Sequence, residues 1–238
     1  MKLFKLCVIA SAIASVATAS TARAAEALVN GDFDFGAAFP WVLTTDGVGW
    51  IGTPSLMTSA QIGTSVWGPN NGAAHSDGFA IGKSYGGNLN GGNQGAYQTF
   101  STGASAQNPL TLNISGFVAG GVGGINPTAH PSSAAWWEVR LIEGAWTNFD
   151  DGTLVWKKEA APATNFGFGW EMAAGSVDIT SPTATLVLKF GTWDDWNWEY
   201  FGAYFDTFSV QVVPEPGSLI ALASGLLGMA GLRLRKRS

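Results

Sequence analysis

The chain has 238 residues, of which only 12% are charged, and its formal net charge is −5. A single cysteine, Cys7, excludes a disulfide framework, and two histidines leave little from which to build a zinc site. Between residues 25 and 213 the chain carries five basic and 16 acidic residues, a net charge of −11. Such a surface repels nucleic acid and anionic lipid, so nucleic acid is not an expected partner.

Residues 1–24 have the organisation of a secretory signal peptide. Lys2 and Lys5 supply a basic start, Leu6 to Ala19 form an apolar stretch, and Ala22-Arg23-Ala24 is a small-residue cleavage site. We therefore expect export by the general secretion machinery, cleavage by signal peptidase, and a mature chain that begins near Ala25. Cys7 would be removed with this segment.

The segment 25–212 is long enough for one domain with a sizeable core. Apolar and polar residues alternate in four stretches, which span residues 110–115, 137–141, 183–190 and 207–212. Stretches rich in glycine and asparagine lie between such runs, as expected of turns and loops. Many short strands with glycine-rich turns predict an all-β domain, either a sandwich or a barrel.

Short motifs at both ends of this domain carry a resemblance. Leu28-Val-Asn-Gly-Asp-Phe-Asp-Phe-Gly leads to Trp41, and Ala203-Tyr-Phe-Asp-Thr-Phe-Ser-Val closes the domain. With Tyr97-Gln-Thr-Phe and Leu110-Thr-Leu-Asn-Ile-Ser-Gly, they resemble the opening, closing and middle strands of jelly-roll carbohydrate-binding modules of the galactose-binding-like superfamily. The resemblance implies a jelly-roll β-sandwich. Asp34 stands at the usual Glu position, and Thr207 replaces the second residue of a common Asp-Asp pair.

The same resemblance implies a structural calcium site. In that superfamily the first and last strands lie close together and often hold Ca²⁺. Asp34 and Asp206 would supply carboxylate ligands, with Asn30 and Asp32 as neighbours, and backbone carbonyls would complete the six to eight oxygens that calcium needs. The alternative is that Asp32 and Asp34 are solvated turn residues and that Asp206 caps a loop.

Eleven tryptophans are a second candidate for function, because a single sandwich core cannot easily bury so many large rings. Sugar rings stack on exposed aromatic planes, and neighbouring carboxylates and amides can bond their hydroxyls. The densest cluster spans residues 193–201, and the alternative is that its rings fill the core. The candidate sugar-binding residues are Trp193, Trp196, Trp198, Tyr200, Asp194 and Asp195.

Catalytic motifs do not appear in the sequence. Glu138, Glu143, Glu171 and Glu199 could pair as a glycosidase requires, but the strand signature of jelly-roll glucanases is missing. No His-Glu-x-x-His or Gly-x-Ser-x-Gly motif is present. We therefore expect a protein that is not an enzyme, with a polysaccharide hydrolase as an alternative.

The segment 213–238 has three parts in order. Pro214-Glu215-Pro216 is followed by 16 uncharged residues, Gly217 to Leu232, and then by a tail with four basic residues. As a helix the uncharged run spans about 24 Å, which is short for a hydrocarbon core of about 30 Å. The basic tail would hold the C-terminus in the cytoplasm.

This order resembles the PEP-CTERM signal of Gram-negative exosortase substrates. The resemblance implies an exosortase-type processing enzyme as a partner, a transient inner-membrane intermediate held by a transmembrane helix, and final placement on the cell surface or in the extracellular matrix. The alternative is a permanent single-pass anchor. For the domain, binding of extracellular polysaccharide, as in a biofilm matrix, stands beside a structural matrix role without a specific ligand.

Overall fold

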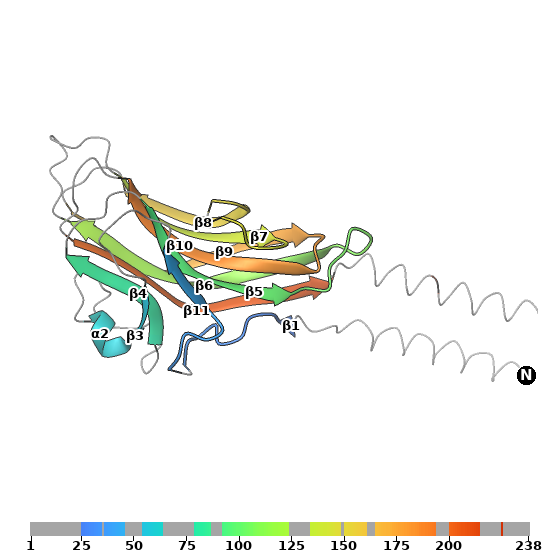
Figure 1. The fold of residues 1–238 in the computed structure, drawn as a ribbon, viewed down its shortest axis with the longest axis horizontal. Coiled ribbons are helices and arrows are strands. Elements are labelled where there is room, and N and C mark those ends of the chain that lie inside the picture. The colour runs from blue at the N-terminus through green and yellow to red at the C-terminus, as the bar shows by residue number, and fades with distance from the viewer. Residues whose placement is uncertain are drawn as a thin grey trace, which may run out of the picture.

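In the computed structural model, residues 25–34, 36–45, 54–63, 79–86, 92–123, 134–148, 150–160, 165–193, 200–214 and 225 are described. They form two β-sheets that face each other, with one short helix against one of them (Figure 1). The predicted signal peptide and the predicted transmembrane helix lie outside these residues, apart from Gly225.

The strands differ widely in length, from two residues to 15. In chain order the elements are β1 (Ala25–Glu26), β2 (Val42–Thr45), β3 (Ser55–Thr58), α2 (Ser59–Gly63), β4 (Phe79–Gly86), β5 (Gly92–Ser101), β6 (Leu110–Gly123), β7 (Ala134–Glu143), β8 (Thr153–Ala160), β9 (Asn165–Ile179), β10 (Thr183–Trp193) and β11 (Tyr200–Pro214).

The described strands pair in two antiparallel sheets. The six-stranded sheet has the order β3-β4-β11-β6-β9, with β1 beside β11, and the five-stranded sheet has the order β2-β5-β10-β7-β8. From β4 onward, the orders β4-β11-β6-β9 and β5-β10-β7-β8 arise because the chain passes repeatedly from one sheet to the other. This is the connectivity of a double-sheet jelly roll. The prediction of an all-β sandwich is confirmed.

The four alternating stretches of the sequence become β6, β7, β10 and β11. Their apolar positions face the core because successive side chains of a strand point to opposite faces. Aromatic rings fill its centre, where Trp137 stacks on Phe201 with ring centroids 5.5 Å apart and an interplanar angle of 7°. The Trp137 Nε1 donates a hydrogen bond of 3.2 Å to the Gly202 carbonyl, so this buried ring also joins the two sheets.

The segment between β1 and β2 closes one side of the sandwich. The Phe208 amide donates to the Gly31 carbonyl at 2.8 Å, and the Gln98 side chain both donates to and accepts from the Val29 backbone. A Cβ atom at Gly31 would lie 1.8 Å from the Phe208 carbonyl oxygen, so only glycine allows this approach. Phe33 of this segment is fully buried. Through its contacts with Phe208 and Gln98, the segment ties β11 of one sheet to β5 of the other.

Candidate functional site

The outer face of the five-stranded sheet carries charged and aromatic side chains on β7 and β10. Core residues such as Trp137 and Leu188 alternate with residues that point away from the core. The outward positions of β7 and β10 pair in rows: Trp136 with Gly191, Glu138 with Lys189, and Arg140 with Val187.

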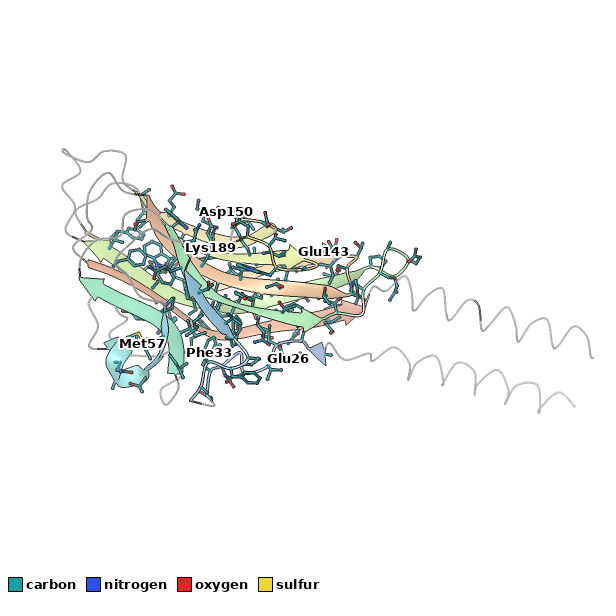
Figure 2. All side chains as sticks on the ribbon, viewed as in Figure 1. Glu26, Phe33, Met57, Glu143, Asp150 and Lys189 are labelled. Carbon is teal, nitrogen blue, oxygen red and sulfur yellow. The ribbon has the colours of Figure 1, made fainter. Side chains whose placement is uncertain are left out.

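The middle row is a compact ionic network. The side chains of Lys189 and Glu138 are only 2% and 5% exposed, and the Lys189 Nζ lies 3.3 Å from the Glu138 Oε2. Arg140 donates from its Nε to the same carboxylate at 2.7 Å, and the Lys157 Nζ lies 3.5 Å from the other oxygen. Lys189 also donates to the Asp150 carboxylate, and Figure 2 shows these two side chains together. Three cations therefore surround one enclosed carboxylate.

These contacts decide the charge state of Glu138. Burial alone raises the pKa of a carboxyl group, but the hydrogen bond from Arg140 and the positive charges of Lys189 and Arg140 outweigh it. The net result is a Glu138 pKa below its ordinary value. The carboxylate is ionised at neutral pH and fully engaged by its cations.

Residues 144–148 and 150–152, between β7 and β8, cover one end of this face. Trp146 stacks on Tyr97 of β5 with ring centroids 4.4 Å apart and an interplanar angle of 7°. Both rings pack over buried Val187 and Ile142. Arg140 holds the part of the loop around Asp150, because its Nη1 donates a hydrogen bond of 3.2 Å to the Asp150 carbonyl. We call this segment the cover loop.

Beyond the ionic row, the next outward position of β7 on the same face is Trp136. Trp136 is half-buried and pairs with Gly191 on one side and with exposed Glu159 on the other. Since Gly191 has no side chain, the position beside Trp136 is unfilled by its neighbour on β10. An aromatic ring beside a glycine, with Glu159 and Lys157 on the neighbouring strand, provides a stacking plane and hydrogen-bonding groups.

The sequence identified a different cluster as the sugar platform. Trp193 is the last residue of β10, pairs with Ala134, and lies two positions along the strand from Gly191. Tyr200 opens β11 in the other sheet. Asp194, Asp195, Trp196 and Trp198 lie outside the described residues, so the geometry of the predicted cluster stays a prediction.

Sequence reasoning passed over Trp136, although the signal was present. Trp136 and Trp137 are adjacent in a strand, so one ring must face the core and the other must face outward. The alternation of Glu138 and Arg140 with core residues showed which face was outward. That Lys189 and Asp150 join the same network could not be found this way, because it depends on which strands pair.

The predicted calcium ligands lie in contrasting environments. Asp206 is fully buried and Asn30 is 7% exposed, whereas Asp34 is exposed in a turn. Asp206 and Asn30 flank the hydrogen bond between Phe208 and Gly31, so the resemblance correctly placed the opening loop against the closing strand. The Asp206 carboxylate accepts from the Thr207 hydroxyl at 3.1 Å. The Asn30 Nδ2 donates to the Ala37 and Phe39 carbonyls, and the backbone carbonyl of Asn30 accepts from the Trp41 Nε1.

Within the described part of the chain, no group of three or more histidine, cysteine, aspartate or glutamate side chains is assembled. None of the described helices is long and apolar enough to span a membrane. Of the predicted sorting tripeptide, Pro214 is the last residue of β11, while Glu215 and Pro216 lie beyond the described strand.

The chain is similar to several solved structures at low sequence identity. The carbohydrate-binding module TmCBM61, solved with β-1,4-galactotriose, is 11% identical, covers 80% of this chain and 99% of its own, and has a TM-score of 0.42. The CBM22-1 xylan-binding domain from Paenibacillus barcinonensis Xyn10C is 12% identical over 81% of this chain and 97% of its own, at 0.38. The K3 cleaved adhesin domain of Lys-gingipain from Porphyromonas gingivalis is 17% identical over 79% and 99%, at 0.41. Because these TM-scores lie below 0.5, no inference about a ligand rests on them.

Comparison by sequence gives one specific result. No curated protein sequence matches the chain. Residues 212–236 match the family described as PEP-CTERM protein-sorting motif, which includes the predicted Pro214-Glu215-Pro216. The chain therefore carries a PEP-CTERM protein-sorting motif, which indicates export and membrane-associated sorting.

Proposed function

We propose that this protein is exported in a Gram-negative bacterium, held briefly in the inner membrane by its tail, processed by an exosortase, and placed on the cell surface or in the extracellular matrix. There its sandwich binds extracellular polysaccharide. The tail motif supports the sorting half of this proposal. The half-buried Trp136 beside Gly191 and Glu159 is the observation that carries the binding half.

The binding face lies on the open part of the five-stranded sheet. The ring of Trp136 offers the stacking plane, and Trp193, two positions along β10 from Gly191, brings the start of the predicted 193–201 cluster to the same sheet. The cover loop forms a wall at the opposite end. Glu138 and Lys189, between Trp136 and the cover loop, would hold the strands in position, since both are buried and paired with each other.

Binding is better supported than hydrolysis. A glycosidase needs one carboxyl group that can donate a proton and a second across the bond. Glu138 is the enclosed carboxylate on this face, and Arg140, Lys157 and Lys189 keep it ionised and occupied. A carboxylate in that state is a poor proton donor, so a hydrolase remains the weaker alternative.

Calcium enters the proposal as a structural ion. The donors near Asp206 and Asn30 are carboxylate, amide and backbone oxygens, which is the donor set that Ca²⁺ prefers. Asp206, Asn30 and Asp34 would hold the ion, and the ion would fasten the opening loop to β11. Chelation should then lower the melting temperature, and added Ca²⁺ but not Mg²⁺ should restore it; an unchanged melting temperature argues against the ion.

The binding half is tested by titrating the full-length chain in mild detergent with a panel of polysaccharides that includes the host's own exopolymer. A saturable change in tryptophan fluorescence is expected with at least one polymer. Trp136→Ala should abolish it, and a joint Trp193, Trp196 and Trp198 substitution should weaken it, both with an unchanged melting temperature. Trp170→Ala is the matched control, because Trp170 is a half-buried tryptophan of the six-stranded sheet.

The alternative is a structural matrix protein without a specific ligand. No fluorescence change with any polymer would favour that alternative. Equal loss of signal in Trp136→Ala and Trp170→Ala would contradict the location of the site.

A further inference from the structure

The first proline of the sorting motif is part of the folded domain. Pro214 is the last residue of β11 and pairs with Leu110 of β6, which in turn pairs with Ile179 of β9. Leu110 is 7% exposed and Ile179 is 1% exposed, so this last row is anchored in the core. No linker separates the sheet from the motif, since the strand ends where the tripeptide begins.

The length of chain that follows limits how far the domain can stand from the membrane. The uncharged run begins at Gly217, and its second residue, Ser218, is four residues from Pro214. Even fully extended, four residues reach at most about 14 Å. A domain of this size has a radius of gyration of about 16 Å. An enzyme that holds the tripeptide at the membrane surface must therefore also meet the end of the sandwich from which β11 emerges.

We call that part of the sandwich the motif-proximal end. It is formed by residues 25–26, the turn 105–108 and residues 178–182, together with Glu143. Its rows follow from the register, because Val213 pairs with Thr111, which pairs with Asp178, while Gln211 pairs with Glu26. Figure 2 shows Glu26 and Glu143 on the same half of the sandwich.

The charged residues that the structure describes at this end are all acidic. Glu26, Glu143 and Asp178 are exposed, and no lysine or arginine lies among the described residues there. Each carboxylate is held in place: Glu143 accepts from the Thr180 amide and hydroxyl at 2.6 Å, Asp178 accepts from Thr111 at 2.7 Å, and Glu26 accepts from the Val210 amide at 2.8 Å. Fixed carboxylates favour a basic protein surface as a partner and disfavour anionic lipid.

We propose that the motif-proximal end is an interaction surface for the membrane enzyme that processes the tail. That enzyme contacts the Pro-Glu-Pro motif and the folded end of the sandwich together, through a basic surface that faces Glu26, Glu143 and Asp178. The inference rests on the proposed function, because it requires that the tail be processed at this motif. It adds that the folded domain contributes to recognition.

The first experiment separates the motif from the domain. A ten-residue Gly-Ser linker between Val213 and Pro214 adds an average reach of roughly 18 Å and removes the fixed spacing. Full-length chains with and without the linker are expressed with the epitope-tagged processing enzyme, and the rate of tail removal is followed by pulse–chase. The linker should slow processing by about tenfold, because the two contacts are no longer presented together. An unchanged or faster rate overturns the inference.

Charge variants sharpen this test. The triple variant E26Q/E143Q/D178N should slow processing in the chain without the linker and have little further effect in the chain with it. Glu171→Gln, a carboxylate on β9 whose side chain is 42% exposed, is the matched control and should change neither rate. Equal effects of the triple variant in both chains would contradict a shared contact.

A direct contact measurement does not depend on the rate. A photo-crosslinking residue at Asn108, in the exposed turn of the motif-proximal end, should form a product with the tagged enzyme. The same residue at Met172, which is 64% exposed on the outer face of the six-stranded sheet, should not. Products with lipid alone, or equal products from both positions, overturn the inference.

One control distinguishes failure of the proposed sorting function from failure of this inference alone. Residues 213–238 are fused through the same linker to an unrelated exported carrier. If neither the carrier fusion nor the natural chain is processed, the proposed sorting function fails and the inference fails with it. If the carrier fusion and the natural chain are processed at equal rates, the sorting function stands and the inference alone is wrong.

Discussion

The two outer faces of the sandwich differ in how they use polar residues. On the five-stranded sheet, Lys189 and Glu138 are buried in an ionic row beneath the cover loop. On the six-stranded sheet, exposed side chains form simple pairs, such as the Thr111 hydroxyl with Asp178 at 2.7 Å and the Ser176 hydroxyl with Asn113 at 2.8 Å. Both faces arise from the same alternation of apolar and polar residues.

From this difference we expect burial, more than residue type, to set the energetic importance of a polar group. A charge taken out of water must be paired, and removing its partner leaves it uncompensated. An exposed pair competes with water and contributes little. The five-stranded face should therefore be sensitive to single substitutions, and the six-stranded face should tolerate them.

The largest effect is expected for Glu138→Ala. This change leaves Lys189, whose side chain is 2% exposed, with Asp150 as the remaining carboxylate of the network. We expect a loss of about 3 kcal/mol in the free energy of unfolding, measured by urea denaturation. Glu159→Ala, at a carboxylate that is 54% exposed, should cost less than about 1 kcal/mol. A similar cost for the two variants would contradict the view that burial sets the importance of a polar group.

A smaller loss is expected for Trp146→Ala. The variant loses the stack on Tyr97 and the cover over Val187 and Ile142. Because Trp146 is only half-buried, the expected cost is about 2 kcal/mol, below the range for a fully buried aromatic residue. Trp146→Phe keeps a ring on Tyr97 and should recover much of the loss. Equal destabilisation by both substitutions would mean that the stack does not hold the cover loop.

Acid should weaken the five-stranded face selectively. The pKa of Glu138 is lowered in the folded protein, so its stabilising contribution is present above the unfolded carboxyl pKa of about 4.3 and is lost as pH falls through the folded value. Unfolding free energy measured from pH 7 to pH 3 should fall in that window. Glu138→Gln should show a shallower fall, and parallel curves for the two proteins would contradict this assignment.

The smallest effect is expected on the six-stranded face. Thr111→Val removes the hydroxyl that donates to Asp178 but keeps the β-branched shape that suits a strand. The change in unfolding free energy should stay within about 0.5 kcal/mol, as for most surface substitutions. Ser176→Ala, at the other hydroxyl pair, should behave alike. A loss above about 1.5 kcal/mol for either variant would show that this face is not the tolerant one.

Some features of the molecule were determined by the sequence alone. The alternation of apolar and polar residues predicted β6, β7, β10 and β11, because a strand repeats every two residues and the repeat needs no partner to be visible. Residues 213–238 carried a sorting motif whose order of parts is local, and residues 212–236 match it. The resemblance carried by Leu28 to Gly36 implied that the first and last strands lie close together, and β1 does pair with β11.

The tertiary structure decided what the alternation could not. Lys189 and Glu138 are 51 positions apart, and only the pairing of β10 with β7 makes them partners. Asp150 reaches the same network because the cover loop folds back over the sheet. Pro214 belongs to the last row of the sheet because β11 pairs with β6 through its final residue. Register and loop placement depend on packing between distant segments, so they determine which outward residues meet and which remain open to a ligand.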